Sequence, residues 1–179
     1  VQAGRGCPKT CSFCSVYCLY RGQYLKRSIP DVIRDIKRVK ELGFKQFLLL
    51  DDNIFSDRNY AIELCAEMKW MTQCSIDIAK DEELLDIIAK SGCYVLSFGL
   101  ESITRESLVS MNKAWAHPEN YSEQIRIIRK HGIDISTEMG GGRRRYLGIH
   151  PCHCRFYRKE SYCGTEILYS YADSRHQVF

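Results

Sequence analysis

Short apolar segments alternate with amphipathic ones along most of the chain, and this alternation limits the fold more than any other feature. Strands are expected at KQFLLLDD (45–52), SIDIA (75–79), CYVLSFG (93–99) and IDISTEM (133–139), with a fifth ending near Val1 to Ala3. Helices are expected between them, at 29–43, roughly 57–71, 81–92, 102–111 and 121–132. Such an order predicts an α/β fold, with a parallel sheet closed or half-closed into a barrel by crossover helices.

The first of these helices has clear end signals. Ser28 is a suitable N-cap, Pro30 fits the first turn, and Gly43 is a plausible stop after the last turn. Between them, apolar residues recur on one helical face, at Val32, Ile36 and neighbouring positions. The segment is therefore predicted to be a crossover helix that packs on the sheet.

Polar residues follow the expected strands, where parallel folds carry their chemistry. Asp51, Asp52 and Asn53 follow the second strand, Asp81 follows the third, and Glu101 follows the fourth. We expect these residues to meet at one rim with the loop after the first strand. A competing interpretation is that Asp52, Asn53 and Asp81 cap the helices that follow them, and that Glu101 is a carboxylate at a helix N-terminus.

That first loop, GCPKTCSFC (6–14), holds Cys7, Cys11 and Cys14 within nine positions. Zinc usually takes four closed ligands in two separated pairs, and no second Cys-x-x-Cys pair occurs, although Cys18 could be a fourth ligand. A redox dithiol would leave the third cysteine without a role. A [4Fe–4S] cluster fits better, because it takes one thiolate per iron and three cysteines leave one iron open.

The spacing Cys7-x-x-x-Cys11-x-x-Cys14, with Phe13 before the last cysteine, resembles the signature of the radical S-adenosylmethionine superfamily. The resemblance extends from about Val1 to Met139. LLLDDNIF, IAKDEELLDIIAKSG, FGLES and SLVSMNKAW resemble the subgroup that carries a cobalamin-binding domain upstream. This resemblance implies a partial parallel (β/α) barrel of radical SAM type, incomplete at its C-terminal side.

The resemblance also implies roles for particular residues. Cys7, Cys11 and Cys14 would ligate three irons, and S-adenosylmethionine would chelate the fourth. Asp51, Asp52 and Asn53 stand where the family binds the ammonium group, in place of its usual Gly-Gly-Glu. Glu101 stands where the family contacts the ribose or the ammonium. Phe13 would line the adenine, with a place in the core as the alternative.

An enzyme of this kind cleaves S-adenosylmethionine reductively to a 5′-deoxyadenosyl radical, and this subgroup methylates unactivated carbons or rearranges rings. The resemblance thus implies a small-molecule or lipid-like substrate and an electron donor such as ferredoxin or flavodoxin. Cobalamin would come through a domain that these 179 residues do not include. Two alternatives stay open: a non-catalytic iron–sulfur electron carrier or structural metal-binding module closed by Cys18, and an inactive fragment of the enzyme.

Composition excludes several other classes. The net charge is +4, and Arg143 to Arg145 form the only basic cluster, so nucleic-acid binding is not indicated. No run of about 18 apolar residues occurs, so no transmembrane segment is expected. Most of the ten cysteines lie in regular-looking elements, which favours a cytoplasmic location over a disulfide framework.

The character of the chain changes after Met139, so the predicted domains are a radical SAM core at 1–139 and an aberrant tail at 140–179. The tail has no helical or strand period, and its Cys-His-Cys at 152–154 is a weak metal motif. When residues 143–178 are back-translated and shifted by one base, permitted codons encode an amphipathic helix, an apolar strand and a Pro-Gly loop. We therefore interpret the tail as a frame-shifted continuation of the same barrel.

Overall fold

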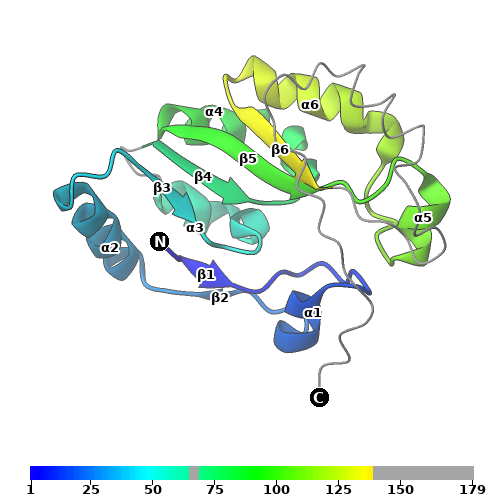
Figure 1. The fold of residues 1–179 in the computed structure, drawn as a ribbon, viewed down its shortest axis with the longest axis horizontal. Coiled ribbons are helices and arrows are strands. Elements are labelled where there is room, and N and C mark those ends of the chain that lie inside the picture. Colours follow the sequence, from blue (N-terminus) through cyan, green and yellow to red (C-terminus); the bar gives the residue numbers. More distant parts are fainter. Residues whose placement is uncertain (65–68, 139–179) are drawn as a thin grey trace.

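The computed structural model describes residues 1–64 and 69–138 of the chain, and a four-stranded parallel sheet is its centre. The strands lie side by side in the order of the sequence: β3 (Gln46–Leu49), β4 (Lys69–Gln73), β5 (Cys93–Gly99) and β6 (Asp134–Glu138) (Figure 1). The expected α/β fold with a parallel sheet is therefore confirmed.

The strands are joined by helices: α2 (Ile29–Glu41), α3 (Arg58–Glu63), α4 (Glu82–Lys90), α5 (Arg105–Ser110) and α6 (Tyr121–Lys130). Three short 3₁₀ turns lie between them: η1 (Ile54–Ser56), η2 (Ile76–Lys80) and η3 (Pro118–Asn120). The predicted ends of α2 are confirmed, because the Ser28 side chain accepts a hydrogen bond from the Asp31 N–H, and Gly43 has a φ of +86°.

The core lies between the sheet and its helices, with α4 packed on β5 and α6 on β6. Mostly alternate residues of each strand point into it, and the buried set from these four strands is Leu49, Trp70, Thr72, Cys93, Leu96, Phe98, Ile135 and Thr137. The residues between them, such as Gln73, Ser97 and Ser136, are only partly buried or exposed. One face of the sheet is thus closed by helices, and the other carries polar side chains together with apolar ones such as Leu48 and Met71.

Two sequence predictions are wrong in the second crossover. The helix expected over roughly 57–71 ends at Glu63, and Lys69–Gln73 is a strand instead. SIDIA (75–79), expected as a strand, lies largely in the 3₁₀ turn η2. Its Ile-x-Ile alternation arises because Ile76 and Ile78 are both buried, in a turn that contacts α4 and α6.

The expected first strand is shorter and lies later than predicted. Val1 donates to the Leu48 carbonyl at 2.9 Å and accepts from the Leu50 N–H at 2.8 Å, as a parallel neighbour of β3 would. The strand itself is β1 (Gly4–Arg5), which pairs antiparallel with β2 (Leu25–Lys26). A short helix, α1 (Ser15–Tyr20), which was not expected, lies between these two strands in sequence. The proposed tail at 140–179, with its frame-shift hypothesis, lies outside the described residues.

Candidate functional site

The three cysteines of the predicted cluster motif lie on the loop between β1 and α1. The Cys11 thiol is buried, at 8% exposure, whereas Cys7 and Cys14 are partly exposed. Cys14 is the N-cap residue of α1, and its N–H donates to the Cys11 carbonyl at 3.2 Å. Cys18 lies one turn further, exposed on α1.

The start of this loop is fixed by the segment after β3. The Gly6 N–H donates to Asp52 Oδ2 at 2.7 Å. Gly6 has a φ of +97°, and a Cβ placed on it would lie 2.0 Å from the Gln23 carbonyl oxygen. Only glycine fits this position, because the backbone is left-handed and the neighbouring atom is also backbone.

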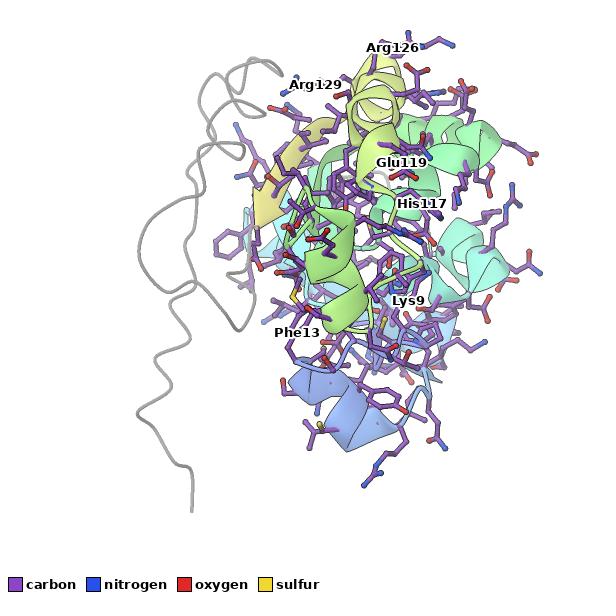
Figure 2. All side chains as sticks on the ribbon, turned by 90° about the vertical axis from the view of Figure 1, so that its right-hand side faces the viewer. Lys9, Phe13, His117, Glu119, Arg126 and Arg129 are labelled. Atoms are coloured by element: carbon purple, nitrogen blue, oxygen red, sulfur yellow. The ribbon has the colours of Figure 1, made fainter. Side chains whose placement is uncertain are left out.

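The rest of the loop is held by residues that follow β4 and β5 in the sequence. Lys9 forms an ion pair with Asp77 at 2.8 Å, and Figure 2 shows Lys9 and Phe13 beside α5. The Ser12 N–H donates to the Met111 carbonyl at 3.0 Å, and Asn112 Nδ2 donates to the Thr10 carbonyl at 2.6 Å. The cysteine loop is therefore bound both to η2 and to the segment that follows α5.

The Asp51 carboxylate is buried and is held by hydrogen bonds within the protein. It is 1% exposed, and its two carboxylate oxygens accept hydrogen bonds from the Ala3 N–H and the Tyr24 hydroxyl, both at 2.8 Å. Burial raises the pKa of this carboxyl above its usual value. The two oxygens thus join the residues just before β1 and β2 to the segment that follows β3.

Asn53 lies beside a cysteine. Its Nδ2 donates to Ser75 Oγ at 3.0 Å and approaches the Cys7 Sγ at 3.7 Å. Its Oδ1 is buried and has no hydrogen-bond partner among the described groups. The side chain does not cap η1, so the capping interpretation is wrong for Asn53. A buried acceptor without a donor costs free energy unless a ligand supplies one.

Glu101 follows β5 in a strained, left-handed conformation, with a φ of +63°. Its carboxylate is 3.6 Å from Lys113 Nζ, and both side chains are largely buried, at 14% and 7% exposure. Lys113 Nζ also donates to the Gly99 carbonyl at 2.7 Å. A Cβ on Gly99 would lie 2.2 Å from Glu101 Oε1, so the carboxylate occupies the space that a side chain there would need.

Two other predicted residues lie apart from this cluster of contacts. Phe13 is 52% exposed and is therefore not part of the core, although Lys113 Nζ lies 6.0 Å from its ring centroid. Asp81 caps α4 through the Leu84 N–H and pairs with Arg58 at 2.6 Å, which confirms the capping interpretation. The hydrogen bond from Arg58 lowers the pKa of Asp81. Asp81 follows η2 rather than a strand, so the expectation that it follows a strand end is wrong.

The thiols suit a cluster better than a single ion. Among residues 1–64 and 69–138, no three Cys, His, Asp or Glu side chains converge closely enough to hold one metal ion. A [4Fe–4S] cluster does not require that convergence, because each thiolate binds a different iron. The thiols are nevertheless near enough that Cys7 and Cys14 both raise the pKa of Cys11, although burial is the larger cause.

Several residues of this site were not assigned a role from sequence. Ser75 contacts Asn53, Lys113 contacts Glu101, and Asp77 pairs with Lys9 of the cysteine loop, yet each is a common polar residue in an ordinary position. The SLVSMNKAW segment, which contains Lys113 and Trp115, contributed to the resemblance. Its sequence did not indicate that it would lie against the cysteine loop.

The class of protein is defined by a parallel βα sheet and by a three-cysteine loop between β1 and α1, and sequence comparison gives the family. The sequence model of the Radical SAM superfamily matches residues 1–145, and the chain belongs to that superfamily. The predicted resemblance is thereby confirmed. No helix in the described part of the chain has the length and apolar character needed to cross a membrane.

Curated relatives include enzymes of tetrapyrrole metabolism. Bacteriochlorophyllide d C-12(1)-methyltransferase of Chlorobaculum tepidum is 32% identical over 143 residues, covering 75% of this chain and 31% of the relative. Anaerobic magnesium-protoporphyrin IX monomethyl ester cyclase of Cereibacter sphaeroides is 36% identical over 145 residues, covering 75% and 23%. The chain therefore spans less than a third of the length of these relatives.

A solved structure shares the fold at low identity. The radical S-adenosylmethionine methyltransferase TsrM of Kitasatospora setae, solved with cobalamin and a [4Fe–4S] cluster bound, has a TM-score of 0.69 at 19% identity. The match covers 78% of this chain and 28% of that one. The cobalamin-dependent S-adenosylmethionine radical enzyme OxsB has a TM-score of 0.66 at 14% identity. These similarities confirm the predicted partial barrel of radical SAM type.

Proposed function

We propose that this chain is the cluster-bearing part of a radical S-adenosylmethionine enzyme of the cobalamin-associated kind. One observation carries the proposal: three free thiols share a loop that is tied on one side to the end of β3 and on the other to the segment after β5. Cys7, Cys11 and Cys14 would each bind one iron of a [4Fe–4S] cluster and leave the fourth iron open.

The open iron would lie near acceptors suited to S-adenosylmethionine. Asn53 Oδ1 is a buried acceptor without a donor beside Cys7, which suits an ammonium group. Asp52 fixes the start of the loop through Gly6 and would add negative charge there. Asp51 belongs to the proposal as a positioning residue, because both of its oxygens already accept hydrogen bonds. Glu101 would contact the ribose or the ammonium, and the exposed Phe13 ring would line the adenine.

When bound and reduced, the cluster supplies the electron that splits the sulfonium–carbon bond, giving methionine and a 5′-deoxyadenosyl radical. The residues of this chain would bind and orient the reactants. The Lys113 ammonium donates to the Gly99 carbonyl and lies beside the Glu101 carboxylate. It would therefore help to hold that carboxylate in place after the left-handed backbone turn at Glu101. The paired polar residues Gln73, Ser97 and Ser136, on the face of the sheet away from the helices, would form part of the wall of the pocket.

The substrate and partners are proposed on the relatives. A small-molecule or lipid-like substrate is supported by relatives that are named for bacteriochlorophyllide and for hopanoids. Cobalamin, which is bound in the solved TsrM and OxsB structures, would bind here to a domain outside these residues. The reducing electron would come from a ferredoxin or flavodoxin. A cytoplasmic location is supported by the six described cysteines, which are all free thiols.

The division at residue 139 is part of the same proposal. Residues 1–139 would form the radical SAM core, and residues 140–179 would be a frame-shifted continuation of it. Support comes from the loss of periodicity after Met139 and from the helix and strand that the other reading frame encodes.

A product assay tests the proposed function. The chain is reconstituted without oxygen with iron and sulfide, reduced with dithionite and given S-adenosylmethionine. Methionine and 5′-deoxyadenosine should form in equal amounts, because one bond is broken per electron delivered. The matched control is Cys11→Ala, which should form neither. Cleavage by both proteins to the same extent, or by neither despite a full cluster in the parent chain, would contradict the proposal.

A further inference from the structure

The segment after α5 lies against the cysteine loop over several residues. This segment, residues 111–115 (MNKAW), accepts the Ser12 N–H at the Met111 carbonyl. Asn112 donates to both the carbonyl and the hydroxyl of Thr10, at 2.6 and 3.0 Å. These bonds join positions about a hundred residues apart in sequence. The MNKAW segment is therefore a fixed neighbour of the loop that carries Cys11.

Trp115 brings a buried donor to this contact. Its Nε1–H is shielded from solvent and has no hydrogen-bond partner among the described groups. The indole belongs to the segment whose Met111 and Asn112 bind Ser12 and Thr10, the two neighbours of Cys11 in sequence. Its ring is also flanked by two ammonium groups, with Lys9 Nζ at 4.2 Å and Lys113 Nζ at 5.2 Å from the centroid. A buried N–H of this kind costs free energy until an acceptor is present.

Lys113 brings a buried positive charge to the same place. Its side chain is 7% exposed, and its Nζ has one short hydrogen bond, to the Gly99 carbonyl, with the Glu101 carboxylate further away at 3.6 Å. Lys113 Nζ also lies 6.0 Å from the ring centroid of Phe13, which follows Cys11 by two residues on the loop. A buried ammonium is stable only where negative charge lies nearby. The Glu101 carboxylate supplies part of that charge, and thiolates on the adjacent loop would add to it.

We propose that Trp115 and Lys113 are positioning residues that support the Cys11 thiolate and raise the reduction potential of a cluster bound to it. The inference rests on the proposed function, since it requires the cluster. Hydrogen bonds to ligand sulfur, and positive charge beside it, stabilise the more negative reduced state. Burial of Cys11 acts in the opposite direction, because a low-polarity site disfavours added negative charge. The two residues thus offset the burial at Cys11, the most deeply buried of the three thiols.

Trp115→Phe is the direct test, since it keeps an aromatic ring at this position and removes the N–H donor. The matched control is Trp70→Phe, because Trp70 is also buried but donates to Ser91 at 3.1 Å, away from the loop. The midpoint potential of the reconstituted cluster is measured by redox titration followed by electron paramagnetic resonance. We expect the potential to shift negative in Trp115→Phe, with the reduced-to-oxidised ratio at a fixed potential falling about fivefold, as for one lost hydrogen bond. Trp70→Phe should match the parent.

The outcomes separate this inference from the proposed function. If the parent chain assembles no cluster, the proposed function fails. If the cluster assembles and Trp115→Phe has the potential of the parent, only the further inference fails. A folded Trp115→Phe that binds no iron would also overturn it, in favour of a purely structural role. If circular dichroism shows that Trp115→Phe does not fold, Lys113→Gln carries the same test, and its potential should shift in the same direction.

Discussion

Replacing Cys7, Cys11 or Cys14 with alanine is expected to reduce cluster content to background in each single variant. Each thiolate would hold a separate iron, and no other cysteine on the loop can take its place. The measurement is iron and sulfide content per chain after anaerobic reconstitution, together with the visible absorption of the cluster. Circular dichroism of the same samples establishes that the sheet is still folded.

Cys18→Ala is the matched control. Cys18 lies four residues after Cys14 and is exposed on α1, so its loss should leave the cluster content of the parent unchanged. Loss of the cluster in Cys18→Ala would contradict the open-iron account. It would favour the alternative of a closed four-thiolate module that carries electrons or supports the fold.

Asp51→Ala is expected to lower the free energy of unfolding by about 3 kcal/mol, as it leaves one buried and one part-buried donor without an acceptor. The donors are the Ala3 N–H and the Tyr24 hydroxyl, which join the chain start and β2 to the end of β3. The measurement is urea unfolding of the full chain, followed by circular dichroism. Because the Cys7 loop begins next to these bonds, cluster content should fall as well.

Asp52→Ala provides the comparison for Asp51. The Asp52 carboxylate accepts one described side-chain hydrogen bond, from the Gly6 N–H at a part-buried position, so its loss should cost about 1 kcal/mol. The alternative from the sequence is that both carboxylates bind the ammonium of S-adenosylmethionine. Unchanged stability in Asp51→Ala, with weakened binding of S-adenosylmethionine, would support that alternative and contradict the positioning role.

Much of the fold could be predicted because its signals are local. The helix α2 carries its cap at Ser28 and its stop at Gly43, and β5 is an apolar run bounded by turn residues. The second crossover could not be predicted in the same way. Apolar residues at Leu64, Met68 and Met71 keep a helical spacing across the true end of α3, and the following strand begins with a lysine. Only pairing with β3 and β5 makes Lys69–Gln73 a strand.

The candidate site divides in a similar way. The cysteines and the residues after β3 were predictable, because their spacing and their position after a strand reflect a chemical requirement. The contacts that Asp77, Lys113 and Trp115 make around the cysteine loop could not be predicted, because they join positions separated by 68 to about a hundred residues of sequence. The position of Asp51 after a strand indicated a ligand-binding role, whereas the structure gives it a positioning role. Its burial becomes evident only when Ala3 and Tyr24 are placed around it.

The most direct test of the open-iron site is electron paramagnetic resonance of the reduced, reconstituted chain with and without S-adenosylmethionine. The account predicts a [4Fe–4S] signal whose g-values shift when S-adenosylmethionine is added, because the ligand binds the iron that no cysteine holds. The Cys18→Ala variant should give the same shift. A fully assembled cluster whose spectrum does not change at saturating S-adenosylmethionine would contradict the central claim.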